Sequence, residues 1–382
     1  MAQNISVPNL DLPASPNVVG VRIIDSTVRL RVPMVMFIKK PLAGHEFLEC
    51  PAYSFLIEHS SGQTLLFDLA LRKDLNSFPP AILAGLQEQS KIPGAGVTIE
   101  KDVASILQDE GSIRLSDVDA IIWRQATISS LRSKGLSLTS DHCCSHWHLD
   151  HSGDPSTFPG STSLIVGPGF KETFLPGYPA NPRGLILETD YQGRDLYEID
   201  FETHPGATKL GSFRAVDYFQ DGSFYLLDSP GHAIGHMAAL ARTTPSTFIL
   251  MGADTCHHCG SLRPTQYNPL PDTLSPSPFS NPPFLPGTVC PGEVLVKIHP
   301  QHVRDKPFYH SLSEAHGRDV AEGEKSIAKL IDFDANEDVL VVMAHDSGLL
   351  DLIDFFPKQA NDWREKGWKE QSRWRFLRDF EP

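Results

Sequence analysis

A nine-residue string near the middle of the chain holds the side chains best suited to chemistry. It reads Ser-His-Trp-His-Leu-Asp-His-Ser-Gly from Ser145 to Gly153, so three imidazoles and one carboxylate fall within six residues. These donors suit Zn²⁺, Mn²⁺ or Fe²⁺. In an extended loop alternate residues face the same side, so His146 and His148 point together, and Asp150 and His151 can turn towards a neighbouring site. The string therefore predicts a metal site.

Three apolar, strand-like segments elsewhere each lead to a further residue of ligand type. A lone histidine is more often structural, but three such segments that each deliver a donor at the carboxyl end predict one shared site. The segments and the residues they deliver are Phe224–Asp228 with His232, Phe248–Gly252 with Asp254, and Val339–Ala344 with His345.

With these motifs the chain resembles the metallo-β-lactamase superfamily, whose signature is H-x-H-x-D-H, over roughly Tyr53 to His345. The resemblance implies an α/β protein with a four-layer αββα sandwich and a site for two divalent metal ions at one edge of the sheets. Donor type does not choose among the candidate metals, and Zn²⁺ is the one we expect. The ligands implied are His146, His148 and His232 for metal one, Asp150, His151 and His345 for metal two, and Asp254 as the bridge.

Such a site predicts a hydrolase. Two cations a few ångströms apart lower the pKa of a water held between them, so hydroxide is available near neutral pH to attack a carbonyl carbon. One metal would polarise the carbonyl oxygen, and the other would stabilise the leaving group. Asp254 would orient the hydroxide and carry its proton. We expect Asp150, Asp254 and His257 to be the catalytic residues, without a Ser or Cys nucleophile.

Within the superfamily, the strings Gly252-Ala253-Asp254 and Ala344-His345-Asp346 are most similar to the N-acyl homoserine lactonases. Those enzymes place a tyrosine three residues after the bridging aspartate, where it contacts the substrate carbonyl. Here that position is His257, which departs from the pattern and weakens the case for acyl homoserine lactones as substrates. His257 could donate a hydrogen bond or a proton to the oxyanion or leaving group, or have a structural role.

The string Cys256-His257-His258-Cys259 could be half of a zinc knuckle or a redox pair. A structural zinc site needs four ligands, and the sequence has no second C-x-x-C. We therefore interpret Cys256 and Cys259 as residues of the site wall.

The elements around these motifs alternate between short apolar runs and loops. This pattern favours two β-rich layers covered by helices. The resemblance implies a single metallo-β-lactamase-fold domain over residues 1–382. Helices are predicted at Val103–Gln108, Leu312–Phe333 and Leu349–Phe356. Besides the three segments above, strands are predicted at Val18–Ile24, Val32–Ile38, Tyr53–Ile57, Thr64–Leu69, Val118–Trp123, Ser163–Val166, Phe213–Tyr218 and Met237–Arg242.

Two segments are atypical, and the chain ends in a third distinct one. Residues 124–144 insert 21 residues between the strand ending at Trp123 and the motif at Ser145; this is either a retained intron in the gene model or a genuine surface loop. Residues 264–291 hold nine prolines in 28 residues and form either a surface loop or a stiff flap beside the site. Residues 357–382 contain three tryptophans among charged residues and are typical of an amphipathic cap.

Composition limits the class of protein. The net charge of -14 argues against a nucleic-acid binder, and no run of 18 or more apolar residues predicts a membrane span. The first residues lack the features of a secretory signal, and six cysteines in 382 residues do not make a disulfide scaffold. We expect a cytoplasmic enzyme with a small-molecule substrate and neither nucleic-acid nor membrane partners.

The leading functional hypothesis is a metal-dependent hydrolase that opens a cyclic ester or cyclic amide, such as a lactone, a lactam or a benzoxazolinone-type cyclic carbamate. Related enzymes detoxify small heterocycles. The alternative is an acyl-thioester hydrolase, either polyketide-type or similar to glyoxalase II, which the cluster Arg373, Arg375 and Arg378 leaves open. A non-catalytic scaffold is disfavoured, because decay of a site normally removes ligands and all seven are present.

Overall fold

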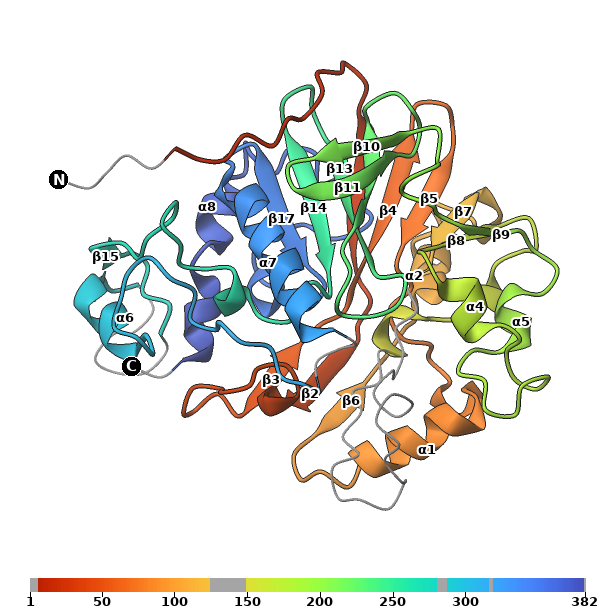
Figure 1. Ribbon diagram of the computed structural model, residues 1–382, viewed down its shortest axis with the longest axis horizontal. Helices are drawn as coiled ribbons and strands as arrows, with labels where there is room; N and C mark the ends of the chain where they lie inside the picture. The colour runs from red at the N-terminus through yellow and green to blue at the C-terminus, as the bar shows by residue number, and fades with distance from the viewer. Residues whose placement is uncertain (1–5, 124–148, 280–286, 316–318, 381–382) are drawn as a thin grey trace.

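The computed structural model describes residues 6–123, 149–279, 287–315 and 319–380. Its centre is a pair of six-stranded sheets packed face to face (Figure 1). The first has the order β1 (Val19–Asp25), β4 (Tyr53–His59), β5 (Thr64–Phe67), β7 (Ala120–Ile122), β8 (Ser163–Val166), β9 (Leu196–Glu198). The second has the order β10 (Ala207–Leu210), β11 (Phe213–Asp217), β12 (Phe224–Asp228), β13 (Met237–Arg242), β14 (Phe248–Ala253), β17 (Val339–Met343).

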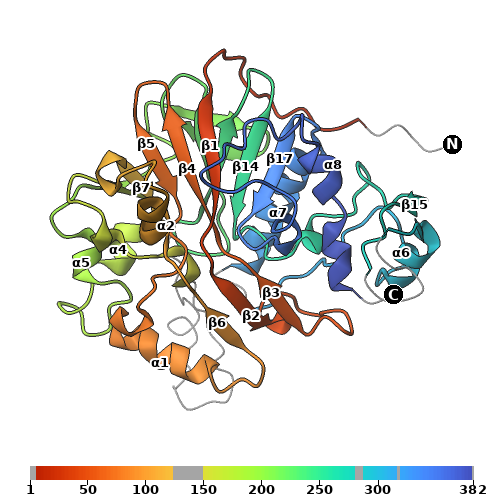
Figure 2. The same ribbon diagram turned by 180° about the vertical axis from the view of Figure 1, so that it is seen from behind.

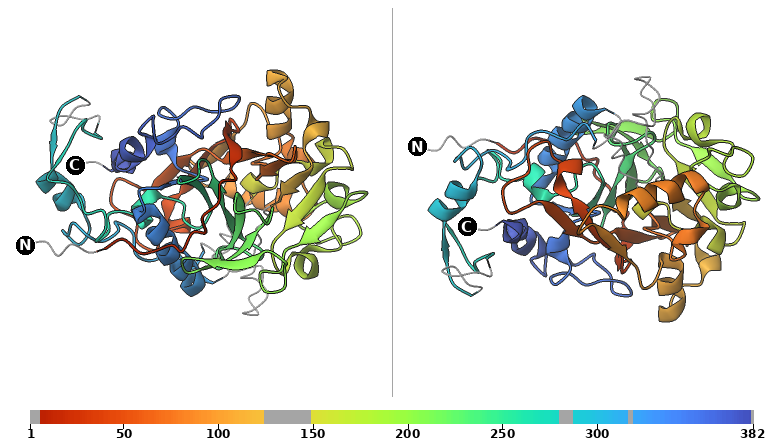
Figure 3. Two further views of the ribbon diagram at one scale, coloured as in Figure 1. Left: turned by 90° about the horizontal axis from the view of Figure 1, so that it is seen from above. Right: turned by 90° about the horizontal axis from the view of Figure 1, so that it is seen from below.

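Helices cover the outer face of each sheet, and Figure 3 shows the blue helices and the orange to yellow-green helices on opposite sides of the strands. The first sheet is covered by α2 (Val103–Glu110), α4 (Phe170–Phe174) and α5 (Glu188–Tyr191), and α1 (Pro80–Gln89) lies below them. The second is covered by α7 (Val320–Ala335) and α8 (Trp368–Ser372). A smaller sheet of β2 (Arg29–Pro33), β3 (Phe47–Cys50) and β6 (Gly96–Thr98) lies below the sandwich (Figure 2).

Three apolar clusters fill the spaces between these layers, because alternate residues of a buried strand point to opposite faces of its sheet. In β14, Ile249 belongs to the cluster between the two sheets, whereas Leu250 belongs to the cluster under α7 with Leu330 and Phe333. The first sheet divides in the same way between the central cluster and a third cluster under α1, α2 and α4. The αββα sandwich is thus confirmed, and its strands β12, β14 and β17 are buried on both faces.

Strand direction brings the ligand-bearing ends together. β12 and β14 each pair antiparallel with β13, and β14 pairs parallel with β17. Strands β12, β14 and β17 therefore run the same way, and their carboxyl ends meet at one edge of the second sheet. His232, Asp254 and His345 all follow these ends in the sequence.

The prediction of a strand over Val32–Ile38 is wrong. The strand β2 ends at Pro33, and residues Met34–Met36 form a 3₁₀ turn in which Phe37 and Ile38 donate backbone hydrogen bonds to the Met34 carbonyl. Proline cannot donate to a ladder, so a strand readily ends there. The turn redirects the chain, and Lys39 pairs with Ser311 instead.

Two helix predictions also need correction. Helix α7 begins at Val320, with the Asp319 side chain accepting from the Glu322 amide at 3.0 Å, and not at Leu312. The segment Leu349–Phe356 is not helical beyond the 3₁₀ turn Ser347–Leu349. The Phe356 amide instead donates to Ile23 of β1 at 2.7 Å, which holds this segment against the sheet edge.

The described part of the proline-rich segment contains β15 (Thr273–Leu274), which pairs antiparallel with β16 (Cys290–Pro291). Strand β16 leads directly into α6 (Gly292–Ile298). The atypical insertion at residues 124–144 lies outside the described residues. Among the described residues, none of the helices combines the length and the apolar character that crossing a membrane would require.

Candidate metal centre

Five of the seven predicted ligands lie in the described part of the chain, and the fold brings them together at the sheet edge. Asp150 and His151 belong to the 3₁₀ turn Leu149–His151, and the other three follow β12, β14 and β17. All five are buried, at 0 to 4% exposure. His146 and His148 lie outside the described residues. The five described ligands are Asp150, His151, His232, Asp254 and His345.

The Asp254 carboxylate is at the centre of this group. Its Oδ2 lies 2.8 Å from His151 Nε2 and 3.1 Å from His232 Nε2, and its Oδ1 lies 3.5 Å from His345 Nε2. Asp150 Oδ2 is 3.4 Å from His345 Nε2 and 3.6 Å from His151 Nε2. The Nε2 atoms of these three histidines, two after strand ends and one in a turn, thus converge on two carboxylates.

The turn that carries His232 is fixed by close packing against α7. Gly231 has φ +114°, and a Cβ there would lie 2.1 Å from the Gly323 nitrogen, so only glycine fits. The Gly231 carbonyl accepts from the Asp319 amide at 2.9 Å, and the Pro230 carbonyl accepts from the Ser326 hydroxyl at 2.7 Å. The amino-terminal half of α7 therefore sets where His232 sits.

The rings of His151 and His345 are oriented by partners on their other nitrogens. His151 Nδ1 donates to Asp68 Oδ2 at 2.6 Å, and His345 Nδ1 donates to the Pro51 carbonyl at 2.8 Å. A proton on Nδ1 leaves the Nε2 lone pair of each ring directed at the carboxylates. This arrangement is typical of metal-binding histidines, whose second nitrogen usually donates to a carboxylate or carbonyl.

The charges of the site also fit divalent cations. Asp150 and Asp254 are buried carboxylates, which are costly unless they are paired or bound to metal, and the partners described for them are imidazoles. Burial by itself lowers the pKa of His345, but Cys50 and Asp254 outweigh it and raise that pKa well above its usual range. The pocket thus favours positive charge, which bound cations would supply.

His257 lies against the same carboxylate. Its Nε2 is 3.7 Å from Asp254 Oδ2, and its ring centroid lies 5.0 Å from that of His232 and 5.2 Å from that of His345. On the other side it stacks on Phe37, with the centroids 4.1 Å apart and the planes at 21°. The turn at Met34–Met36 that brings Phe37 here therefore helps to shape the site.

A second group of possible ligands, His45, His258 and Asp379, lies elsewhere and has hydrogen bonds that disfavour a metal. His258 Nδ1 accepts from the Gly260 amide at 3.0 Å, so its Nε2 carries the proton that it donates to Asp379 at 3.1 Å. That nitrogen has no lone pair left for a cation. His45 Nδ1 is bonded to the Tyr309 hydroxyl at 2.6 Å.

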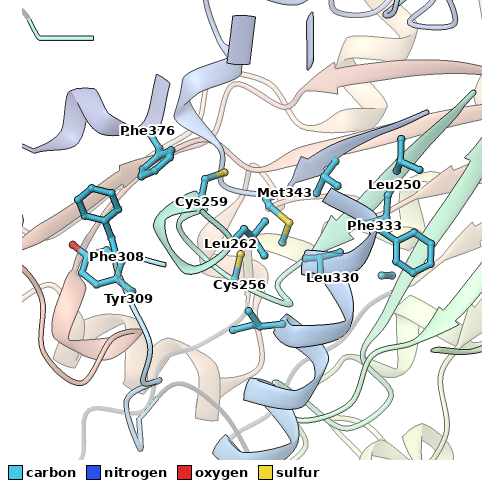
Figure 4. Close-up of a cluster of buried hydrophobic side chains, with 14 of the residues drawn as sticks. Leu250, Cys256, Cys259, Leu262, Phe308, Tyr309, Leu330, Phe333, Met343 and Phe376 are labelled. Atoms are coloured by element: carbon cyan, nitrogen blue, oxygen red, sulfur yellow. The ribbon is translucent and has the colours of Figure 1, made fainter. Parts of the chain in front are cut away.

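Cys256 and Cys259 pack in the apolar layer under α7, among Leu262, Phe376 and Met343 (Figure 4). Burial raises the pKa of both thiols, and Cys259 donates to Asp346 Oδ2 at 3.3 Å. A buried, protonated thiol is a poor nucleophile and a poor redox centre. The geometry gives this pair a packing role.

The arginine cluster near the carboxyl terminus is already paired. Arg373 binds Glu337, and Arg375 and Arg378 both bind Asp351. These ion pairs explain the arginine cluster, which in the sequence left a hydrolase similar to glyoxalase II open.

Two residues of the site, Asp68 and His236, were missed by sequence reasoning. Asp68 follows β5, so the rule that a donor ends a strand applied to it as well. His236 lies four residues after His232; it accepts from the Asp254 amide through Nε2 and donates to the Ser229 carbonyl through Nδ1. The spacing of the two histidines was the available signal.

Comparison with known proteins identifies the superfamily of the chain. It is 43% identical to the γ-lactamase FDB1 of Fusarium pseudograminearum over 98% of this chain and 86% of that protein. The chain belongs to the metallo-β-lactamase superfamily. It spans only 39% of a longer relative, the monooxygenase mpaDE' of Penicillium brevicompactum, to which it is 41% identical.

This superfamily member shares its fold with a variant of Bacillus thuringiensis AiiA with N-decanoyl-L-homoserine bound at the active site. The TM-score is 0.51 and the identity 16%, over 90% of this chain and 99% of that one. No family model matches the chain. As a superfamily member the protein is a metal-dependent hydrolase, and the buried group of histidines and aspartates is the candidate site for its divalent metal ions.

Proposed function

We propose that this metallo-β-lactamase superfamily member opens a cyclic ester or cyclic amide: a lactone, a lactam or a benzoxazolinone-type cyclic carbamate. The observation that carries the proposal is the convergence of His151, His232 and His257 on one oxygen of Asp254. Two imidazoles that we propose as metal ligands, and a third that we propose as a hydrogen-bond donor, thus surround a single carboxylate oxygen. The γ-lactamase name of the relative FDB1 supports a cyclic amide in particular.

Two divalent cations, which we propose to be Zn²⁺, would supply hydroxide at neutral pH and polarise the substrate carbonyl. His146, His148 and His232 would hold one cation, and Asp150, His151 and His345 the other. Asp254 would bridge them. The hydrogen bonds from His151 to Asp68 and from His345 to Pro51 hold the liganding rings in the tautomer that this role needs.

The chain's own residues would then handle the proton and the developing charge. The Asp254 carboxylate is held among imidazoles, where it would accept a proton from the attacking water and pass it to the leaving oxygen or nitrogen. His257 would donate to the substrate carbonyl oxygen as charge develops on it, in the place where lactonases have a tyrosine. The stack on Phe37 limits rotation of the His257 ring and so fixes the direction of this donor.

The proposed partner is a small molecule, with neither nucleic acid nor membrane involved. A net charge of -14 disfavours a polyanion. The glyoxalase II-like form of the thioester alternative loses its supporting feature, because Arg373, Arg375 and Arg378 pair with carboxylates of the chain itself.

Proton release by metal-loaded protein tests the proposal on three substrates: a γ-lactone, benzoxazolinone and an acyl thioester. Turnover of a cyclic substrate that disappears in Asp254→Asn supports it and shows whether ester or amide is preferred. Thioester cleavage with no ring opening would transfer the assignment to the alternative. Absence of turnover on all three, in protein shown to hold two metals, would refute it.

A further inference from the structure

The turn that presents Asp254 has a strained backbone. Ala253 has φ +54°, a left-handed conformation that costs a non-glycine residue about 1 kcal/mol, and the pairing of β14 with β17 shifts register between Met251 and Ala253. Such strain persists only where surrounding contacts impose it. This conformation directs the Asp254 carboxylate towards the histidines of the candidate metal site. The contacts that hold the turn therefore also hold the carboxylate.

Those contacts come from two directions. Within the turn, the Thr255 amide and hydroxyl donate to the Gly252 carbonyl at 3.2 and 2.7 Å. From outside, the Asp254 amide donates to His236 Nε2 at 3.2 Å. The last bond anchors the backbone of the carboxylate residue itself.

His236 connects this turn to the one that carries His232. Because Nε2 of His236 accepts a hydrogen bond, its Nδ1 carries the proton, and this Nδ1 donates to the Ser229 carbonyl at 2.8 Å. Ser229 lies three residues before His232, and its hydroxyl also bonds the Thr255 hydroxyl at 2.9 Å. The imidazole, which is 4% exposed, thus spans two turns that each present a ligand.

We propose that His236 is a positioning residue that sets the spacing between His232 and Asp254, and thereby the affinity for the metal that these two residues share. This rests on the proposed metal centre and goes beyond it, because His236 would touch neither metal nor substrate. His232 Nε2 and Asp254 Oδ2 are 3.1 Å apart, a separation that two ligands of one cation require. If the Asp254 turn relaxed, this pair would separate while the rest of the ligand ring stayed in place.

Two substitutions test the two hydrogen bonds of the His236 imidazole one at a time. In His236→Asn the amide nitrogen falls near the position of Nδ1 and can still donate to Ser229, but the side chain is too short to reach the Asp254 amide. In His236→Gln the longer side chain places its oxygen near Nε2 and keeps the acceptor. We expect zinc affinity, measured by chelator competition, to fall about ten- to a hundred-fold in His236→Asn and by only a few-fold in His236→Gln.

His299 provides a matched control. It is fully buried and has the same kind of bonds, accepting from the Gln301 amide at 3.2 Å and donating to the Lys306 carbonyl at 2.8 Å, but it lies outside the ligand ring. His299→Asn should lower the melting temperature of the metal-free protein without changing zinc affinity. Adding Ala253→Gly to His236→Asn should restore several-fold of the lost affinity, because glycine adopts the left-handed conformation without strain.

Zinc affinity that is unchanged in His236→Asn, with only a lower melting temperature, would overturn the proposal and leave a structural role. Equal losses in the Asn and Gln variants would also overturn it, because the acceptor for the Asp254 amide would then be irrelevant. Zinc binding does not depend on the substrate. A wild-type protein that binds zinc with the expected dependence on His236 but opens no ring would refute the proposed function alone.

Discussion

Replacing Asp68 by asparagine should weaken the metal site without unfolding the protein. The bond from His151 Nδ1 to Asp68 Oδ2 is 2.6 Å long and joins side chains that are 2% and 1% exposed. A buried hydrogen bond to a charged group contributes about 1.5 to 3 kcal/mol, and one between neutral groups about 0.5 to 1.5 kcal/mol. Removing the charge should therefore cost about 1 to 1.5 kcal/mol, or roughly ten-fold in metal affinity.

Asparagine is the informative replacement because of the backbone at this position. Asp68 has φ +75°, a left-handed conformation that asparagine adopts with less strain than alanine. The amide oxygen of asparagine can still accept from His151 Nδ1. The Ala70 amide, which donates to Asp68 Oδ1 at 2.7 Å, would have to share this oxygen or face the amide nitrogen. An alanine variant would combine the loss of the bond with strain and confuse the two.

The assay is a zinc titration against a competing chelator, with the unfolding of metal-free protein followed in parallel. Asp334→Asn is the control: it breaks a buried ion pair with Arg263 near the carboxyl end of α7, about 16 Å along the helix from Gly323, on which Gly231 packs. This variant should lose stability and keep its zinc affinity. If Asp68→Asn binds zinc as the wild type does, or if Asp334→Asn loses as much affinity, then the orienting role of Asp68 is refuted.

Three further outcomes follow from the structure. His257→Gln should retain both metals by elemental analysis while kcat falls about a hundred-fold, as on loss of one oxyanion donor; loss of a metal ion would show that His257 is a ligand instead. Burial and the neighbouring His258 lower the pKa of His45 from 6.5 to about 3. Only the unfolded chain then gains this proton below pH 6.5, so metal-free protein should lose up to about 1.4 kcal/mol per pH unit on acidification, and urea unfolding at several pH values should show a shallower slope in His45→Asn. Leu330→Ala, in the fully buried face of α7, should cost about 2 to 5 kcal/mol in the same assay, whereas the exposed Lys325→Ala should change stability by less than about 0.5 kcal/mol; equal effects would contradict the layered core.

Apolar strands that are buried on both faces could be predicted from the sequence because their residues all satisfy one local rule. The predicted bounds of Ser163–Val166, Phe224–Asp228 and Met237–Arg242 agree with β8, β12 and β13. The same rule predicted that donors at strand ends would meet, since strands that run the same way share an edge. It failed at Val32–Ile38, where contacts with residues far along the chain decide the conformation: the Met34 amide donates to Glu46, and the Ser313 amide to Phe37.

The sequence by itself determined the superfamily, the sandwich and the residue types available at the sheet edge, because each depends on patterns within a few residues. The tertiary structure decided how those residues are oriented. Asp68 is 83 residues from His151, and Pro51 is 294 residues from His345, so only the folded chain brings together the groups that fix each imidazole. The stack of Phe37 on His257 and the bond from the Asp254 amide to His236 are likewise products of packing. Ligand chemistry is a property of side chains, whereas ligand direction depends on neighbours that the fold alone supplies.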